Sequence, residues 1–451
     1  MKKTALLTLL LSAALFITGL SPGLVPICAS GPPPPVLEAE TAILIDQASG
    51  KILYAQNADK TMYPASTTKI LTALLAVESG DLTEIVTIGN EVLWIPWDSS
   101  KAGFDVGDQI TLEELVYGLM LPSGNDAAYT IAVHLARRQA LDPELPISAA
   151  LKLFAEMMNQ RARQLGAVNS NFTVPDGYHD DNHYTTARDL ALIAREALNH
   201  ELIREVASTG RYLSKTWIGS NCRPWVNTNQ LIRSAGKFYY EKATGLKTGY
   251  TGAAGFCLVS SAANQDLNLL TVVLNTSKDG RWTDSIKLLE YGWENFTWQQ
   301  LVASGEKVCS AALCNQDDNQ PETISLTAVK GFAGVFARKD LPRLKKTVVL
   351  KDKADGYKKN RAMASGATVT LSAPLKKGEV VGTLVFTLDG QELFRTGLAA
   401  STDVPAKPWW RDLVLPGSLT LVLGLTSVLL IHCRRKRRRH RYIFRHKRIG
   451  I

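Results

Sequence analysis

Cysteine is scarce in this sequence, and the few residues present do not suggest a metal site. Only six cysteines occur in 451 residues, and no combination of cysteine and histidine has the spacing of structural zinc sites. His179 and His183 lie four positions apart, but Pro175, Gly177, Asp180 and Asp181 around them predict a loop in which both histidines are solvated. Repeats of solenoid period are also missing. We therefore expect no metal and no other cofactor.

The same scarcity limits disulfide bonding. Of the six cysteines, Cys222, Cys257, Cys309 and Cys314 lie outside the apolar stretches at the two ends of the chain. An exported protein could form one or two disulfides from these four, and Cys309 and Cys314 are the pair closest in sequence. The sequence leaves the pairing open.

A basic excess is missing from most of the chain. The net charge is +9, but residues 434–451 contain ten basic and no acidic residues, so removing them leaves a net charge of −1. A nearly neutral remainder does not predict the basic surface that nucleic acids require, and we expect no nucleic-acid partner. A basic tail directly after a membrane span is explained by membrane orientation and anionic lipid.

Charged residues are absent from a long stretch near the start of the chain. Two lysines follow Met1, and the apolar run Ala5–Leu20 comes next. This order is typical of a secretory signal peptide, which we place at residues 1–30. A lipoprotein signal ending at Cys28 is the alternative, although the bulky Ile27 stands where such signals need a small residue.

A second uncharged stretch lies near the end of the chain. Leu413–Cys433 provides 21 residues without a charged side chain, about the number that crosses a hydrocarbon core of roughly 30 Å as a helix. Trp409 and Trp410 precede it and the basic tail follows, as at the two faces of a membrane. We expect a linker at 401–412, a single-pass transmembrane helix at 413–433, and a cytoplasmic tail at 434–451.

The chain between these ends shows two patterns. Residues 38–298 combine a predicted hairpin at 42–55 with predicted helices and strands, which favours an α/β (α+β) domain with one antiparallel sheet flanked by helices. Residues 300–400 contain short β-rich runs between turns and predict a small all-β domain. The helices are expected at 70–77, 112–120, 127–138, 151–165, 187–198 and 285–296, and the later strands at 254–262, 267–274, 347–350, 368–371, 380–388 and 391–395.

The pattern Ser66-x-x-Lys69 opens the first apolar helix. Residues three positions apart share a helix face, so the amine of Lys69 can reach the hydroxyl of Ser66. A serine becomes nucleophilic when a base takes its proton, and a desolvated lysine can be that base. Ser234 and Ser304 also precede a lysine by three positions, but neither begins an apolar helix.

Two more short motifs complete a set. Ser123-Gly124-Asn125 alone reads as a loop capping a helix, and Lys247-Thr248-Gly249 alone reads as a glycine-rich turn before a strand. In the order S-x-x-K, S-x-N and K-T-G, the three motifs match one mechanistic set. Coincidence then becomes a poor explanation.

These motifs resemble those of penicillin-binding proteins and serine β-lactamases. The flanking words Thr186–Leu190, Asn227–Asn229 and Gly245–Thr251 are similar to the low-molecular-mass D-alanyl-D-alanine carboxypeptidases, over about residues 38–298. The resemblance implies a β-lactamase/transpeptidase-like fold and removal of the terminal D-alanine from peptidoglycan stem pentapeptides outside the bacterial cell membrane. It also implies covalent inhibition by β-lactam antibiotics.

The same resemblance implies a role for each motif residue. Ser66 would be the acylated nucleophile, Lys69 its general base, and Ser123 a proton relay toward the leaving D-alanine. The backbone N–H groups of Ser66 and Tyr250 would form the oxyanion hole. The implied substrate-binding residues are Asn125 for the amide, Lys247 and Thr248 for the terminal carboxylate, Gly249, Tyr250, and Arg281 near the carboxylate pocket.

Two other functions remain alternatives. A class A β-lactamase carries a glutamate in E-x-x-L-N between the second and third motifs, but Glu144 and Glu156 lack the following Leu-Asn. A non-enzymatic penicillin sensor or scaffold would need a large cytoplasmic domain, whereas about 18 residues follow the predicted span. The sequence does not indicate the residue at the third stem position, the oligomeric state, or whether the substrate is vegetative wall or spore cortex.

Overall fold

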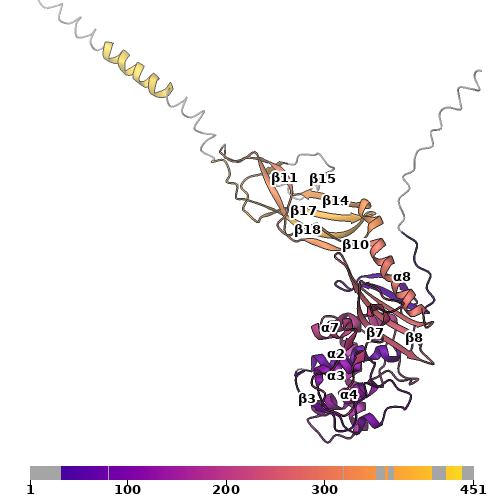
Figure 1. Cartoon of the computed structure of the whole chain (residues 1–451). Helices are drawn as coiled ribbons and strands as arrows, with labels where there is room; N and C mark the ends of the chain where they lie inside the picture. Colours follow the sequence, from indigo (N-terminus) through magenta and orange to yellow (C-terminus); the bar gives the residue numbers. More distant parts are fainter. Residues whose placement is uncertain are drawn as a thin grey trace, which may run out of the picture. The chain divides into compact units, whose positions relative to one another are not determined.

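A computed structural model describes most of the chain between the two ends (Figure 1). The predicted signal peptide, the first ten residues of the predicted span and the end of the predicted tail lie outside the described residues. Of the span and tail, residues 423–438 are described and are helical. Within the described part, no helix combines the length and hydropathy needed to cross a membrane. The structure describes residues 32–79, 81–317, 319–351, 361–363, 370–408 and 423–438.

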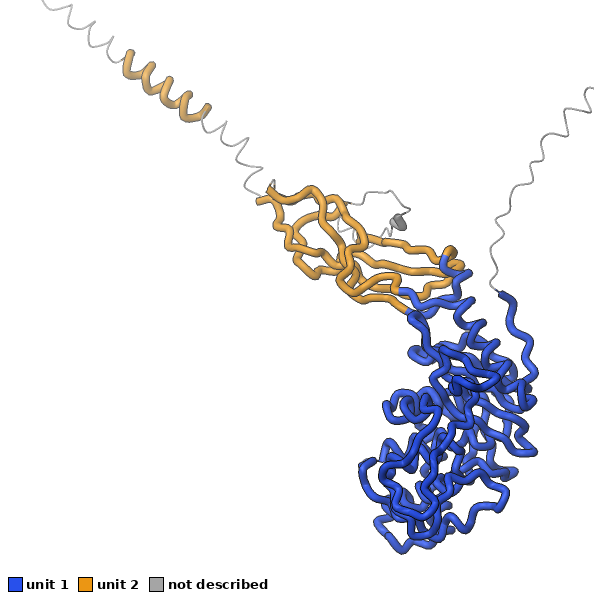
Figure 2. Tube along the Cα trace, in the orientation of Figure 1, with its two compact units in different colours: residues 1–299, 334–341 blue, residues 300–333, 342–451 orange. Residues whose placement is uncertain are grey.

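The chain divides into two compact units, shown in different colours in Figure 2. The first contains the residues up to 299 together with 334–341, and the second contains residues 300–333 and those from 342 onward. All of the predicted site residues belong to the first unit.

The first unit is built on a five-stranded antiparallel sheet with the order β2-β1-β9-β8-β7. Strand β1 comes from the start of the unit and pairs with β9 from its end, with Ile43 opposite Val272. Among the strands that the structure describes, β7 is therefore an edge strand, and one side of its backbone has no strand partner in this sheet. The strands are β1 (Thr41–Asp46), β2 (Ile52–Gln56), β7 (Ala243–Thr251), β8 (Gly255–Ala263) and β9 (Asn268–Thr276).

Both faces of this sheet are covered. In β1, Ile43 and Ile45 join the large core formed with the central helices, while Leu44 joins a second core with helix α8 (Gly280–Asn295). All six residues of β1 are buried, because alternate side chains enter opposite cores. The predicted antiparallel sheet flanked by helices is confirmed.

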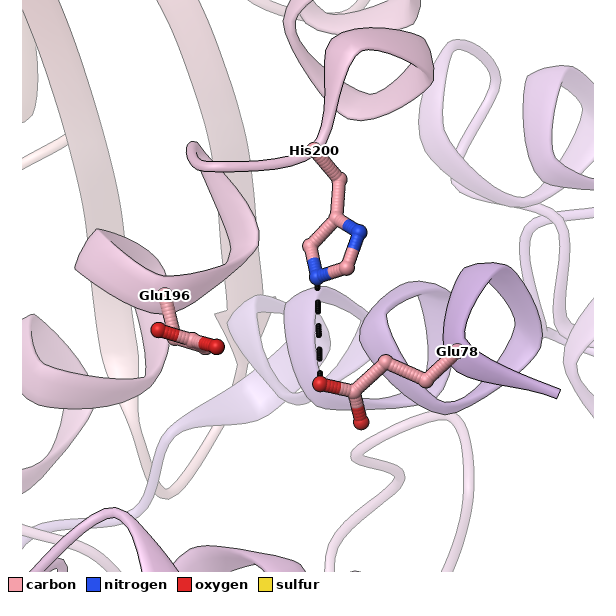
Figure 3. Close-up of side chains that lie close together, drawn as sticks. All are labelled: Glu78, Glu196 and His200. Atoms are coloured by element: carbon pink, nitrogen blue, oxygen red, sulfur yellow. Dashed lines mark ion pairs between the residues drawn. The ribbon is translucent and has the colours of Figure 1, made fainter.

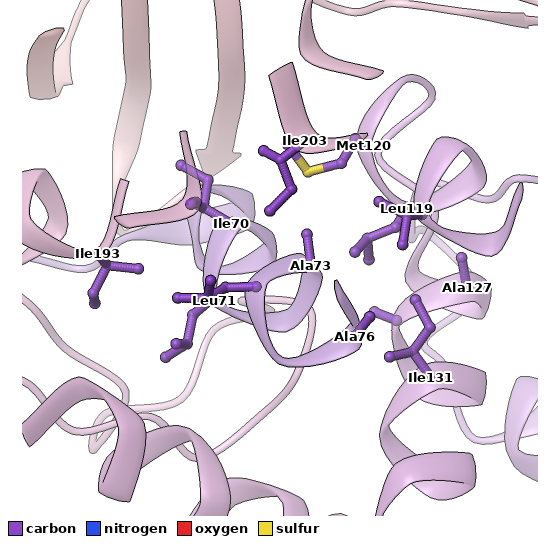
Figure 4. Close-up of a cluster of buried hydrophobic side chains, with 14 of the residues drawn as sticks. Ile70, Leu71, Ala73, Ala76, Leu119, Met120, Ala127, Ile131, Ile193 and Ile203 are labelled. Carbon is purple, nitrogen blue, oxygen red and sulfur yellow. The ribbon is translucent and has the colours of Figure 1, made fainter. Parts of the chain in front are cut away.

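Helix α2 (Lys69–Glu78) lies in the middle of the helical part and is buried along most of its length. Its small residues Ala73 and Ala76 lie toward Leu119 and Ile131 of the neighbouring helices (Figure 4). Alanine has no side chain beyond Cβ, so the helices can pack closely there. This packing holds the middle of α2 among its neighbours. The neighbouring helices are α3 (Leu112–Met120), α4 (Asn125–Ala140), α5 (Ile147–Gln164), α6 (Ala187–Ala197) and α7 (Glu201–Ser208).

The structure corrects two expectations for this unit. The segment containing Lys247-Thr248-Gly249 is strand β7 itself and not a turn before a strand. Helix α7 was missed because it is only eight residues long, which is too short for a clear helical period. Short strand pairs also occur between β3 (Ile85–Thr87) and β4 (Gln109–Thr111), and between β5 (Arg211–Tyr212) and β6 (Trp225–Val226).

The second unit contains a seven-stranded sheet with the order β15-β14-β17-β18-β12-β11-β16. Its core includes Leu326, Leu384 and Leu398, all fully buried. The predicted all-β domain is confirmed, although β11 and β12 were not predicted. The strands are β11 (Lys307–Cys314), β12 (Thr323–Ala328), β14 (Leu344–Leu350), β15 (Arg361–Met363), β16 (Thr370–Ser372), β17 (Val380–Leu388) and β18 (Gln391–Ala400); β10 (Phe296–Val302) and β13 (Phe332–Ala337) pair separately.

The cysteines that the structure describes are free thiols. Cys309 and Cys314 both lie on strand β11, where five residues of extended chain span roughly 16 Å. A disulfide requires two Cα atoms within about 7 Å. The pair closest in sequence therefore cannot form a disulfide in this fold.

Candidate active site

Ser66 lies in the short 3-10 turn η1 (Ala65–Thr68), directly before α2. The α-helix begins at Lys69, one residue before the expected start at 70, and Ser66 lies in the turn that precedes it. The turn still brings the two side chains together, with Lys69 Nζ 3.0 Å from Ser66 Oγ. The buried hydroxyl of Thr67 donates to the carbonyl oxygen of Pro64 at 2.6 Å and stabilises the turn.

The amine of Lys69 is fully buried and surrounded by oxygen atoms. Besides Ser66 Oγ, it contacts Asn125 Oδ1 at 2.7 Å and the backbone carbonyl oxygen of Asp176 at 2.7 Å. Burial lowers the pKa of Lys69 to about 8, against the opposing charges of Asp176 and Asp126. A neutral amine has two N–H donors and one lone pair. The carbonyl-type oxygens can take both donors, which leaves the lone pair for the Ser66 hydroxyl.

Ser123 and Asn125 lie at the start of helix α4. Ser123 has a φ of +65°, a left-handed conformation that non-glycine residues rarely adopt. Such strain is concentrated at functional sites. The backbone N–H of Asn125 donates to the Ser100 carbonyl oxygen at 2.8 Å, and this bond ties the start of α4 to another segment that lines the pocket.

Strand β7 forms the other side of the site. A Cβ atom on Gly249 would lie 3.0 Å from the Pro64 carbonyl oxygen and 3.2 Å from the Ser66 backbone nitrogen, so glycine lets β7 approach the serine turn closely. The Thr248 hydroxyl is 2.8 Å from that of Thr228. The ring of Tyr250, which is more than half exposed, stacks on Phe256.

Lys247 is almost completely buried behind this strand, and its Nζ donates to the Thr248 carbonyl oxygen at 3.1 Å. Burial lowers the pKa of Lys247 well below its usual value, and the charges of Lys69 and Arg281 act in the same direction. This cluster of basic groups favours a bound anion, since an anion would offset the repulsion among them.

Arg281 lies at the edge of the site on helix α8. Its guanidinium carbon is 4.7 Å from the ring centroid of Phe256 and 4.5 Å from that of Trp282. Burial lowers the pKa of Arg281. Among the described residues, Arg281 Nε is a buried donor without a hydrogen-bond partner, and Arg281 is one of the residues that line the pocket.

A pocket of about 440 Å³ brings most of the predicted site residues together. Lys69 and Lys247 lie behind its wall, in contact with wall residues. Thr228 and Thr251 belong to the sequence words Asn227–Asn229 and Gly245–Thr251, and the other lining residues that were not predicted come from loops and turns whose position depends on the fold. The lining residues are Ser66, Ser123, Asn125, Thr248, Gly249, Tyr250 and Arg281, which were predicted, and Asp98, Ser99, Ser100, Gly177, Tyr178, His179, Thr228, Thr251 and Gly252, which were not.

The two loop histidines differ, and the expectation that both are solvated is wrong for His183. Its ring is buried, with Nδ1 accepting from the Thr173 backbone N–H at 3.0 Å and Nε2 2.8 Å from the Thr68 hydroxyl. Burial lowers the pKa of His183 to about 4, so the ring is neutral and supports the loop behind the serine turn. His179 is partly exposed and lines the pocket.

In the described part of the chain, one cluster of side chains outside the pocket could in principle hold a metal ion. Oxygen and nitrogen atoms of Glu78, Glu196 and His200 lie within 4.8 Å of one another (Figure 3). The guanidinium of Arg161 already contacts Glu78 at 2.5 Å and Glu196 at 3.1 Å. A cation at this place would meet the charge of Arg161, so we interpret the group as an ion-pair network that connects α2, α5 and α6.

Comparison with known proteins identifies the family. The D-alanyl-D-alanine carboxypeptidase family matches residues 29–278, and the penicillin-binding protein 5 C-terminal domain matches residues 296–406. The chain belongs to the D-alanyl-D-alanine carboxypeptidase family. It is 30% identical over 375 residues to D-alanyl-D-alanine carboxypeptidase DacF of Bacillus subtilis, covering 81% of this chain and 86% of the relative.

Two further comparisons agree with this membership. D-alanyl-D-alanine carboxypeptidase DacA of Haemophilus influenzae is 32% identical, over 83% of this chain and 87% of the relative. The crystal structure of penicillin binding protein 5 from Haemophilus influenzae is 31% identical, covers 83% of this chain and 100% of the solved chain, and has a TM-score of 0.58. The predicted serine D-alanyl-D-alanine carboxypeptidase of low molecular mass is confirmed. Its substrate is a peptidoglycan stem peptide, and its fold binds β-lactams.

Proposed function

We propose that Ser66 is the nucleophile and Lys69 the general base of this carboxypeptidase. The observation that carries the proposal is the 3.0 Å contact between Lys69 Nζ and Ser66 Oγ, made by an amine whose other two contacts are carbonyl-type oxygens. Neutral Lys69 takes the hydroxyl proton while Ser66 Oγ attacks the carbonyl carbon of the penultimate D-alanine. The peptide bond then breaks, D-alanine leaves, and the rest of the stem peptide stays as an ester on Ser66.

Ser123 transfers the proton to the departing nitrogen in this proposal. It lines the same pocket as Ser66 and Asn125, so its hydroxyl can lie between the base and the leaving group. The Asn125 side-chain oxygen accepts from Lys69, which directs its NH₂ group to donate to a substrate carbonyl. Water then hydrolyses the ester by the reverse proton path.

The terminal carboxylate of the substrate binds between Thr248 and Arg281. A bound carboxylate favours the charged form of the buried Lys247 behind the strand, and Thr248 contributes a hydroxyl that Thr228 orients. Charge-assisted hydrogen bonds to carboxylates are among the stronger polar contacts. This arrangement favours substrates with a free chain end, as an exopeptidase requires.

The oxyanion forms near the backbone N–H groups of Ser66 and Tyr250. Gly249 supports this assignment, because its backbone approaches the Ser66 nitrogen closely. As an edge strand, β7 also offers backbone groups to an extended peptide, and a peptide chain can pair with it as an additional strand. Such pairing holds the scissile bond beside Ser66.

The chain acts outside the cytoplasmic membrane as a single-pass protein in this proposal. The support comes from the amino-acid sequence, which has an apolar leader at 1–30, the uncharged stretch at 413–433 and ten basic residues after it. Peptidoglycan lies outside that membrane, so export of the catalytic unit brings the enzyme to its substrate.

β-Lactam antibiotics acylate Ser66 and remain attached. The opened ring keeps its leaving amine tethered, whereas D-alanine diffuses away and admits water. The sequence also lacks the E-x-x-L-N glutamate that activates the deacylating water in class A β-lactamases. Penicillin should therefore inhibit this enzyme and not be destroyed by it.

The test is a comparison of the native chain with Ser66→Ala. We expect the native chain to release D-alanine from a pentapeptide ending in D-alanyl-D-alanine, and to gain one penicillin mass on the peptide that contains Ser66. The variant should lose both, because one hydroxyl performs both reactions. Native-like labelling of the variant would place the nucleophile elsewhere, and rapid hydrolysis of many equivalents of penicillin by the native chain would favour a β-lactamase.

A further inference from the structure

An exposed apolar segment continues the wall of the active-site pocket. Leu93, Trp94 and Trp97 expose 71%, 53% and 90% of their surfaces. Tryptophan is highly buried on average, so a nine-tenths exposed indole beside a second exposed indole requires an explanation. Asp98, directly after Trp97, lines the pocket. The indoles therefore lie on the same chain segment as the pocket wall.

This segment is held in place by its neighbours. Val92 and Ile95 are 8% exposed and anchor it from below. The backbone N–H of Trp94 donates to the Glu91 carbonyl oxygen at 3.1 Å, and that of Ser99 donates to Pro96 at 3.1 Å. The backbone that carries the exposed indoles is thus already ordered, so little conformational entropy of this segment would be lost when a ligand binds.

We propose that Trp94 and Trp97 bind the glycan strand that carries the stem peptide. The inference rests on the proposed function, because peptide attached to peptidoglycan brings sugar rings next to the pocket. Sugar rings present faces of C–H groups that pack against the flat indole, while their hydroxyls stay in water. Exposed apolar surface next to a polar site is typical of ligand-binding grooves.

The charge of the segment favours an uncharged partner over a membrane surface. Residues 91–108 contain four acids and one base, a net charge of −3. Anionic lipid attracts basic segments and repels acidic ones. The sugar rings of a glycan strand are uncharged, so the acidic residues of this segment do not repel them from the indoles. We therefore assign the tryptophans to sugar contact, and lipid contact becomes an outcome that the experiment can detect.

The experiment compares two substrates with the full chain. One is a free pentapeptide ending in D-alanyl-D-alanine, and the other carries the same pentapeptide on a peptidoglycan tetrasaccharide. The measured quantity is the ratio of kcat/KM for the glycan-linked substrate to that for the free peptide. We expect Trp97→Ala to lower this ratio by roughly tenfold, mainly through KM, as loss of an aromatic stacking contact would.

Two variants provide controls. Trp298→Ala removes another exposed tryptophan, 47% exposed on β10, and should leave the ratio unchanged. Trp97→Tyr keeps an aromatic ring and should restore most of the ratio. Thermal unfolding of each variant reports whether the chain still folds, and a destabilised Trp97→Ala would be replaced by Trp94→Ala, for which a lower ratio is also expected.

The outcomes separate this inference from the proposed function. If the native chain released no D-alanine from either substrate, the proposed function would fail. If it acted on both but Trp97→Ala and Trp94→Ala kept the native ratio, the glycan contact alone would be wrong. A ratio that stays native while binding to phosphatidylglycerol vesicles falls would assign the indoles to lipid and also overturn the inference.

Discussion

At the scale of single residues, the protonation of Lys69 decides the chemistry of the proposed mechanism, in which this amine is the general base. The amine must be neutral to take the proton from Ser66, and burial brings its pKa to about 8. The carboxylate of Asp176 acts in the opposite direction and favours the charged amine. Asp176 is itself buried, and within the described part of the chain its Oδ2 has no hydrogen-bond partner. The side chain of Asp176 therefore raises the pKa of Lys69, while the backbone carbonyl oxygen of Asp176 holds the Lys69 amine in position.

The first prediction concerns pH. Because the active form is the neutral amine, kcat/KM should fall as the pH drops below about 8. Asp176→Asn removes a charge that raises the pKa of Lys69, so the acidic limb should move about one pH unit lower. Pentapeptide hydrolysis followed from pH 5 to 10 measures the shift. Asp59→Asn, on the surface beside Arg188, is the control, and an unmoved limb in Asp176→Asn would contradict the assignment.

The sequence could predict only part of this environment. The contact between Ser66 and Lys69 follows from a spacing of three residues, so it is local. The backbone oxygen of Asp176 and the ring of His183 come from more than 100 positions away. Only the fold brings such distant groups together. The sequence pattern alone therefore wrongly predicts that His183 is solvated.

At the scale of elements, Glu114 shows how the helices are fixed around the site. This buried carboxylate on α3 accepts from the Tyr212 hydroxyl at 2.7 Å, the Thr216 backbone N–H at 2.9 Å and the Ser214 hydroxyl. Burial alone would raise the pKa of Glu114, but hydrogen bonds from the hydroxyls of Ser214, Thr216 and Tyr212 and from the Lys215 backbone N–H lower it to about 2. The hydrogen bonds of the Glu114 carboxylate thus hold α3 against the segment 212–216.

The second prediction follows from this carboxylate. Glu114→Gln should lower the free energy of unfolding at pH 7 by about 2 kcal/mol, since it replaces a charged acceptor and leaves donors poorly satisfied. The folded pKa lies below the usual value of 4.5, so the stabilisation is complete above about pH 4.5 and is lost as the pH falls toward 2. Urea unfolding at pH 7 and pH 3 should show a smaller difference at pH 3.

Glu113→Gln is the matched control for this prediction. Glu113 precedes Glu114 on the same helix but is only partly buried, so its change should shift stability by less than about 0.5 kcal/mol. A Glu114→Gln chain as stable as the native one would show that the network contributes nothing to holding α3.

The elements themselves were predictable where one pattern dominated. Helix α3 has the expected bounds, because a threonine cap and apolar spacing agree there. Strand β7 was taken for a turn because glycines at positions 245, 249 and 252 weaken a strand pattern. At Gly249 the missing side chain makes room for the Pro64 carbonyl oxygen. The expectation that glycines interrupt a strand was therefore wrong at the position where the site requires two backbones to pack closely.

At the scale of the whole molecule, the two units have separate cores, and the chain crosses between them more than once. Residues 334–341 belong to the first unit, where the Val335 carbonyl oxygen accepts from Lys51 Nζ at 2.6 Å. The sequence pattern could not predict that residues 334–341 rejoin the first unit, because this depends on contacts between residues nearly 300 positions apart. The site residues, by contrast, all lie between 66 and 281, within the first unit.

The last prediction separates attachment from catalysis. Deleting residues 413–451 removes the predicted span and the basic tail, and none of the described residues that line the pocket belongs to this stretch. We expect kcat/KM on a free pentapeptide to stay within about twofold of the native value, since a remote change that leaves the folded site intact leaves its kinetics intact. Cell fractionation should find the native chain in the membrane pellet and the truncated chain in the soluble exported fraction.

Activity and location can fail independently in this experiment. A truncated chain that still sediments with membranes would show that attachment does not depend on 413–433, and the single-pass proposal would be wrong. A truncated chain that melts at the native temperature but no longer releases D-alanine would make the tail part of the catalytic unit. A substitution of the tail bases alone by glutamine separates the effect of the span from that of its flanking charge. Catalysis should stay unchanged, because the described residues that line the pocket include none of the tail bases. The positive-inside signal that orients the span should become weaker.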